Sequence, residues 1–192
     1  MSRITVLVVC TLALALCAGY AVAETTPGPD TLKVDYFANA NTAGAPDGTV
    51  RLTNPGTNGG SLCANIYVFD AEEELSECCS CILSPDDLRT LSVNSNLTAN
   101  PLTGVTLNTG VVKYVSTPPP TSGVCPTYPT ELNPVAGIRG WSTHIQNSNF
   151  TITETVDQDA TLSAAEVSRL DVQCYAIQID GSGKGQCSCG SN

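Results

Sequence analysis

The chain has 192 residues and a formal net charge of −10, with 14% charged side chains and ten cysteines. The acidic balance argues against binding to nucleic acid or to anionic membrane surfaces, because both partners need basic patches. The length fits one domain that can bury its own core, and the many Thr, Ser, Asn and Gly residues are typical of extracellular β-proteins.

The first 23 residues have the pattern of a secretory signal peptide. Arg3 is the basic head, residues 4–18 are an apolar run, and Ala21-Val22-Ala23 is a small-residue cleavage site. The apolar run is short for a membrane-spanning helix and no second one follows in the sequence, so we expect no membrane attachment after cleavage.

Cleavage at this site would leave a mature chain that begins at Glu24 and forms one domain over residues 24–192. A lipoprotein anchored through Cys17 is the alternative, but Leu16 is bulky where such a signal needs a small residue. We therefore expect a protein that is secreted, extracellular or on the cell surface, with the periplasm as a further option.

Eight cysteines remain after this cleavage. They are Cys63, Cys78, Cys79, Cys81, Cys125, Cys174, Cys187 and Cys189. An even number in an exported chain predicts disulfide bonds, but eight cysteines allow about 105 pairings, so connectivity stays open. Because neighbouring cysteines bond only with strain, we expect the tail at residues 187–189 to be bonded back onto the strand at residues 78–81.

The chain is organised around residues 62–93. Residues 64–70 read ANIYVFD and are apolar on both faces, which predicts a central strand rather than an edge strand. Asp70, Glu72, Glu73 and Glu74 follow and predict a solvated turn. A cation site with oxygen ligands is the alternative, although the spacing matches no calcium loop.

A second strand with cysteines on both faces follows this turn. Cys79 and Cys81 share one face, and Cys78 takes the other. Ser84-Pro85-Asp86-Asp87 predicts a sharp reversal, and with the strand at residues 88–93 it predicts a hairpin. A short helix with Ser84 as its N-cap is the alternative.

Alternating apolar and polar residues predict the remaining strands. They are residues 32–38, 49–53, two short strands within 105–115, a hairpin of 138–146 with 150–156, and a last strand at 175–179. Residues 117–134 hold six prolines and predict an extended spacer fixed at Cys125. A capping box at residues 163–166 predicts one helix over Ala164–Gln173.

The predicted fold is all-β: a jelly-roll-like or Ig-like antiparallel sandwich with one short helix in the C-terminal half and several disulfides.

The sequence predicts no catalytic residue, no cofactor and no metal site. The GSGKG run at residues 181–185 lacks the spacing of a phosphate loop and predicts a glycine turn. His144 is the only histidine, and we expect it to be an ordinary strand residue. Trp141 is the only tryptophan, and we expect it to be a core or half-core residue. Hydrolysis by two carboxylates stays open, because sequence alone does not pair them. Asn96 and Asn149 begin glycosylation sequons that matter only in a glycosylating host.

The clustered cysteines allow a second interpretation. The CCxC run at residues 78–81 and the CxC run at 187–189 could bind Cu(I) or Zn(II) as thiolates. Cys78 and Cys81 also have the spacing of a redox pair, although they lie in a strand-rich region.

The segment CANIYVFDAEEELSECCSCILSPDDLRTLSVN resembles exported, Cys-rich β-proteins of environmental bacteria. The resemblance covers the central third of the chain and the C-terminal helix. That group has no activity assigned to it, so the resemblance implies export and a Cys-rich β-fold and no site residue.

We expect a secreted, non-enzymatic structural or interaction protein. In its sharper form this is a filament or surface-layer subunit, in which the strand Leu32–Ala38, on a leader at residues 24–30, pairs with the open sheet edge of a neighbour. The alternative is that this strand pairs within its own sandwich. The alternative function is an exported thiolate metal-binding or redox protein.

Overall fold

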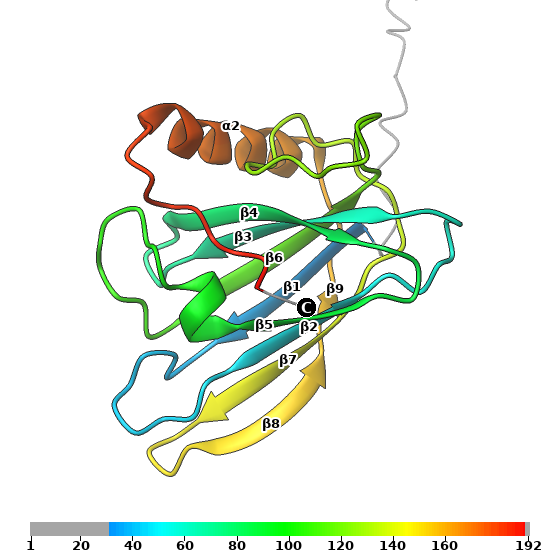
Figure 1. Ribbon diagram of the computed structural model, residues 1–192. Helices are drawn as coiled ribbons and strands as arrows, with labels where there is room; N and C mark the ends of the chain where they lie inside the picture. The colour runs from blue at the N-terminus through cyan, green and yellow to red at the C-terminus, as the bar shows by residue number, and fades with distance from the viewer. Residues whose placement is uncertain (1–30, 191–192) are drawn as a thin grey trace, which may run out of the picture.

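Two antiparallel sheets face each other in a computed structural model that describes residues 31–190 (Figure 1). The predicted signal peptide and leader lie outside the described residues. The sheets form a β-sandwich, with one α-helix across the outer face of the first sheet. The predicted all-β sandwich, with a helix in the C-terminal half and several disulfides, is confirmed.

The first sheet has the strand order β4-β3-β6-β1-β9 and the second has the order β5-β2-β7-β8. The elements are β1 (Leu32–Phe37), β2 (Thr49–Thr53), β3 (Leu62–Phe69), β4 (Leu75–Leu83), β5 (Leu88–Ser92), β6 (Gly110–Thr117), β7 (Arg139–Gln146), β8 (Thr151–Val156), β9 (Gln158–Asp159), the α-helix α2 (Ala164–Asp180) and one π-helical turn, η2 (Val93–Leu97). Every strand pair is antiparallel, and the predicted β7–β8 hairpin is confirmed.

Strand β3 is the most buried strand of the first sheet. All eight of its residues are buried, and it pairs with β4 on one side and β6 on the other. Ile66 and Val68 belong to the core between the sheets, whereas Tyr67 and Phe69 belong to a second cluster beneath α2. A strand that is covered on both faces is apolar on both, so the predicted central strand is confirmed.

Helix α2 is longer than predicted, and the predicted strand at residues 175–179 is wrong. The Ser163 hydroxyl accepts a hydrogen bond from the Glu166 backbone N–H at 3.1 Å, as expected of an N-cap. Buried Leu170, Cys174 and Ile177 continue the helical spacing. The helix ends where Gly181 takes a left-handed conformation with φ of 64°.

The predicted hairpin across residues 84–87 is also wrong. The turn exists, with the Asp87 N–H donating to the Ser84 carbonyl at 3.0 Å, but β5 pairs with β2 in the second sheet. The turn therefore carries the chain from one sheet to the other. Alternation shows that a strand follows a turn, but it does not show which strand becomes the partner.

Within residues 105–115 the structure has one strand rather than the predicted two. Only residues from Gly110 onward pair with β1 and β3. Leu107 is buried in the core, and the Asn108 carbonyl accepts from the Ala40 N–H at 3.0 Å. A side chain at Gly110 would clash with the Phe69 carbonyl and the Phe37 ring. The short strand β9 and the turn η2 were not predicted, because neither contains a periodic apolar pattern.

Four disulfides hold the sandwich together. They join Cys63 to Cys125, Cys78 to Cys174, Cys79 to Cys187, and Cys81 to Cys189. The first fixes the proline-rich spacer to β3, and the second fixes α2 to β4. The last two bond the tail at residues 187–189 to β4, as the sequence predicted.

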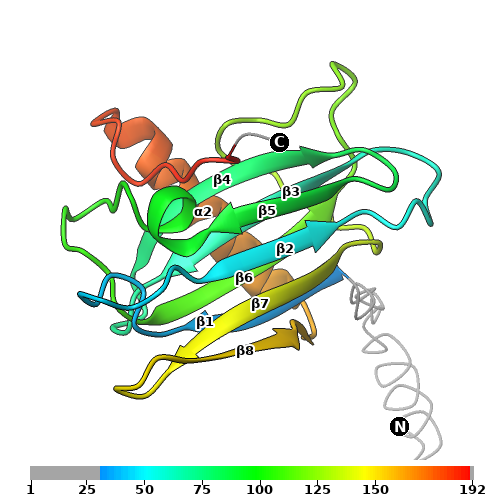
Figure 2. The ribbon, with the colours of Figure 1, turned by 60° about the horizontal axis from the view of Figure 1, so that its bottom comes forward.

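The tail closes one side of the sandwich. The Cys78 N–H donates to the Gly185 carbonyl at 2.8 Å, and Cys187 is buried between the sheets. Figure 1 shows this segment in red, passing from the end of α2 toward β5. The opposite side, between β1 and β8, has no such cover among residues 31–190 and is called the open side below (Figure 2).

Candidate functional site: the open side of the sandwich

Strand β8 forms the outer margin of the open side. It pairs with β7 along one edge, and within residues 31–190 no strand pairs with its other edge. All six of its residues, TITETV, are exposed, and the apolar Ile152 and Val156 are 56% and 55% exposed. The N–H and C=O groups of its outer edge are therefore available to another strand.

A groove of about 410 Å³ lies beside this strand. The first sheet lines it with Val34, Asp35, Tyr36, Val111 and Gln158, and the second sheet lines it with His144, Gln146, Thr155 and Val156. Strand β9 pairs with β1 only at Lys33 and Val34, so the groove continues the slot that β9 fills.

His144 forms the buried floor of the groove. Its Nε2 lies 2.7 Å from the Thr155 hydroxyl and 3.4 Å from a carboxylate oxygen of Asp35. The Tyr36 ring stacks on the imidazole with a centroid distance of 4.3 Å. His144 is 3% exposed, so the predicted strand histidine is confirmed, but its place beside Asp35 was not predicted.

A second carboxyl group, Asp157, lies deeper in the same polar cluster. It accepts a hydrogen bond from the Ser142 hydroxyl at 2.7 Å. Burial, and then a hydrogen bond with Asp35, raise the pKa of Asp157 to about 8. Burial, and then the charge of Asp157, raise the pKa of Tyr114, whose hydroxyl lies in the same region. At neutral pH a protonated Asp157 can therefore donate a hydrogen bond to the Asp35 carboxylate.

The acidic members of this cluster lie at different depths. Asp35 and His144 reach the groove, but Asp157 does not line it and is 2% exposed. The groove offers an apolar rim, a polar floor and an open strand edge.

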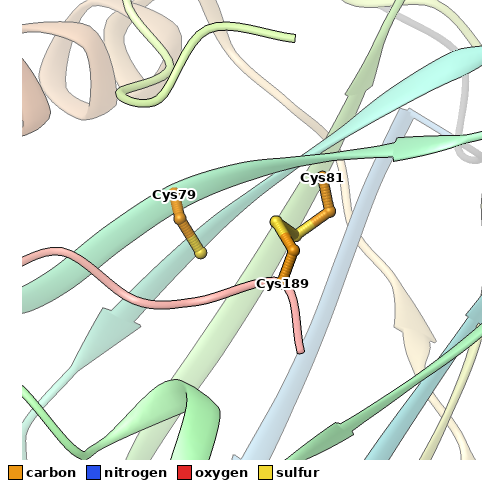
Figure 3. A group of neighbouring side chains, drawn as sticks. All are labelled: Cys79, Cys81 and Cys189. Carbon is orange, nitrogen blue, oxygen red and sulfur yellow. A yellow bond between two sulfur atoms is a disulfide. The ribbon is translucent and has the colours of Figure 1, made fainter. Parts of the chain in front are cut away.

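Within residues 31–190, the only group of three or more potential metal-ligating side chains consists of Cys79, Cys81 and Cys189. The Sγ atoms of Cys79, Cys81 and Cys189 lie within 4.8 Å of one another (Figure 3). Cys81 is bonded to Cys189, and Cys79 is bonded to Cys187. Sulfurs bonded in this way are not thiolates, so metal binding would first require their reduction.

The other predicted features do not line the groove of the open side. Glu72, Glu73 and Glu74 are exposed in the β3–β4 turn, in agreement with a solvated turn. Residues 182–185 lead from α2 into the tail, and Trp141 is half-buried on β7, as predicted.

The two sequons lie in different surroundings. The Asn96 side chain accepts from the Ser92 N–H and donates to the Ser188 hydroxyl, both at 2.8 Å, and Thr98 of the same sequon is 3% exposed. Asn149 is exposed at the tip of the β7–β8 hairpin.

In a glycosylating host we expect a glycan on Asn149 and none on Asn96. Intact-mass analysis should show a loss of glycan mass in Asn149→Gln and no change in Asn96→Gln, and a glycan on Asn96 would contradict this.

The four disulfides indicate an oxidising setting, extracellular or periplasmic. Of the described helices, none has the length and apolar character needed to span a bilayer. Comparisons with protein-family models, with curated proteins and with solved structures found no match.

Proposed function

We propose that the protein is a secreted, non-enzymatic structural or interaction protein whose subunits join by strand addition at the open side. In its sharper form it is a subunit of an extracellular filament or surface layer. The observation that carries the proposal is the exposed outer edge of β8, which no strand of residues 31–190 pairs with, beside a groove with an apolar rim. Such an edge binds an extended segment through backbone hydrogen bonds, and the groove selects its side chains.

The composition of β8 supports this function. Native edge strands avoid aggregation with lysine, proline, bulges or inward-pointing charges. Strand β8 contains no lysine, no proline and no bulge. Its one charged residue, Glu154, is exposed and forms an ion pair with Arg51 of β2. Five of its six residues are β-branched, which favours an extended strand.

The other edge strands are protected by comparison. The tail binds the outer edge of β4 at Cys78, and the Arg89 guanidinium of β5 donates to the Cys189 carbonyl at 2.8 Å. Strand β9 has only two residues. The open side is therefore the surface best suited to receive a strand.

The N-terminal segment is the donor that we propose. In a single chain β1 lies between β6 and β9 and pairs with both. Exchange between subunits would place the β1 of a neighbour in that same slot and would preserve these hydrogen bonds. Assembly in this scheme needs two contacts, the exchanged β1 in its slot and the outer edge of β8 against the neighbouring subunit.

The test compares two threonines on the two edge strands of the second sheet. Thr153 of β8 and Thr90 of β5 are both exposed. Native secreted material should show filaments or sheets by electron microscopy, and Thr153→Lys should leave folded particles that do not assemble. Thr90→Lys should assemble normally. Isolated monomers in the native material, or normal assembly of Thr153→Lys, would contradict the proposal.

A thiolate metal or redox protein is the second candidate. The clustering of Cys79, Cys81 and Cys189 within 4.8 Å favours it, because Cys187 could supply a fourth ligand after reduction. Free-thiol titration and metal analysis of the natively purified protein distinguish the two candidates. Four disulfides without metal would exclude the second one.

A further inference from the structure

Helix α2 has an apolar face that points away from the protein. Its inner face buries Leu170, Cys174 and Ile177 against the first sheet. On its outer side Val172, Tyr175 and Ile179 are 63%, 53% and 64% exposed. Their spacing of three and four residues aligns them along one stripe, where a surface helix of a monomer would carry polar side chains.

A groove of about 570 Å³ runs along one flank of this stripe. Gln173, Ala176, Ile177 and Asp180 of α2 form one wall, and Glu73, Glu74, Leu75 and Leu102 form the other. We call the stripe and this cavity the α2 groove. Leu75, Leu102 and Ile177 are among its apolar lining residues, and three carboxylates also line it, from Glu73, Glu74 and Asp180.

Acidic side chains give the α2 groove a negative charge, which Arg169 offsets in part at Glu73. The last turn of α2 has no basic residue, so the negative end of the helix dipole adds to the charge of Asp180. No lysine or arginine lines the groove among the described residues. Toward the start of the helix, Lys113 and Arg169 both bind Glu166, at 2.6 Å and 2.9 Å.

We propose that the α2 groove binds a basic amphipathic helix of another protein. Apolar side chains of that helix would cover Val172, Tyr175 and Ile179, and its lysine or arginine side chains would reach the carboxylates that line the groove. Charge complementarity selects this occupant. The same groove of a second copy would set these carboxylates against one another, and an anionic membrane would also be repelled. The inference is independent of the proposed function, because α2 covers the first sheet, whereas β8 belongs to the second.

The experiment uses the purified full chain and two labelled synthetic helices of about 14 residues, one of leucine and lysine and one of leucine and glutamate. Fluorescence anisotropy should show saturable binding of the leucine–lysine peptide alone. The double variant Val172→Ser/Ile179→Ser should lower the affinity by about tenfold or more, since both side chains are exposed and the fold does not depend on them. The triple variant Glu73→Gln/Glu74→Gln/Asp180→Asn should lower it by about tenfold and remove most of its salt dependence.

Two matched variants complete the design. Leu88→Ser removes an apolar side chain that is 56% exposed on β5, and Glu72→Gln removes a charge from the same turn outside the groove. Both should bind the leucine–lysine peptide as the wild type does. Equal binding of the two peptides, equal losses in the matched variants, or a role for Val172 and Ile179 only in self-association would each overturn the inference.

Discussion

Replacing Cys63 and Cys125 together by alanine is expected to lower the free energy of unfolding by roughly 4 kcal/mol, from the chain entropy of a loop of this size. This bond spans 62 residues, and no other disulfide shortens the loop that it closes. The loss should exceed that from removing either tail bond, although each tail bond spans 108 residues.

The tail bonds are partly redundant. Once Cys79 is bonded to Cys187, the bond from Cys81 to Cys189 closes a loop of only about six residues, which corresponds to roughly 2 kcal/mol. The same holds with the two bonds exchanged. Removing both should therefore cost more than the sum of the two single losses.

Urea unfolding followed by circular dichroism measures these differences at one pH. The four proteins to compare are the wild type, the Cys63/Cys125 pair variant, and the alanine variants of each tail pair. If either tail pair variant is less stable than the Cys63/Cys125 pair variant, the redundancy argument is wrong.

The variant Asp157→Asn is expected to be more stable than the wild type at pH 9 and similar to it near pH 4. The pKa of Asp157 is raised from 3.8 to about 8 in the folded protein. The folded state therefore holds a proton that the unfolded state has lost between these two pH values. The stability that this proton contributes to the wild type is fully present below pH 3.8 and falls as the pH rises to about 8, by about 1.4 kcal/mol per pH unit.

The side chain of asparagine keeps a donor for Asp35 and an acceptor for Ser142 without carrying charge. Burial also raises the pKa of Glu77 to about 8, so the variant should keep part of the wild-type slope. Urea midpoints measured between pH 4 and pH 9 provide the test, with exposed Glu72→Gln as the control. Parallel curves for wild type and Asp157→Asn would show that the buried pair does not share a proton.

The sequence predicted those features that depend on local patterns. Alternation located most of the strands, the capping box located the start of α2, and the clustering of the cysteines predicted that the tail bonds to residues 78–81. The bond from Cys78 to α2 was not predicted. The helix was cut short because Tyr175 and Ile179 have side chains that favour strands. Their exposure on α2 shows that tertiary packing of Cys174 and Ile177 decided the outcome.

The candidate site could not be predicted, because it is made by contacts between distant strands. Asp35 and Asp157 lie 122 positions apart in the chain and meet only when the two sheets pack. The open edge of β8 depends on strand order, which alternation does not determine. Polar Lys33 and Asp35, which share a face of β1 with buried Phe37, were the only local sign of a polar region inside the sandwich.

The position of the tail has a consequence for biosynthesis. Cys174, Cys187 and Cys189 are the late partners of three of the four bonds. A nascent chain released before residue 174 could close only the bond between Cys63 and Cys125. Truncated products should therefore lack three disulfide bonds and be readily degraded by proteases. Oxidative folding would in this way favour chains that are translated through residue 189.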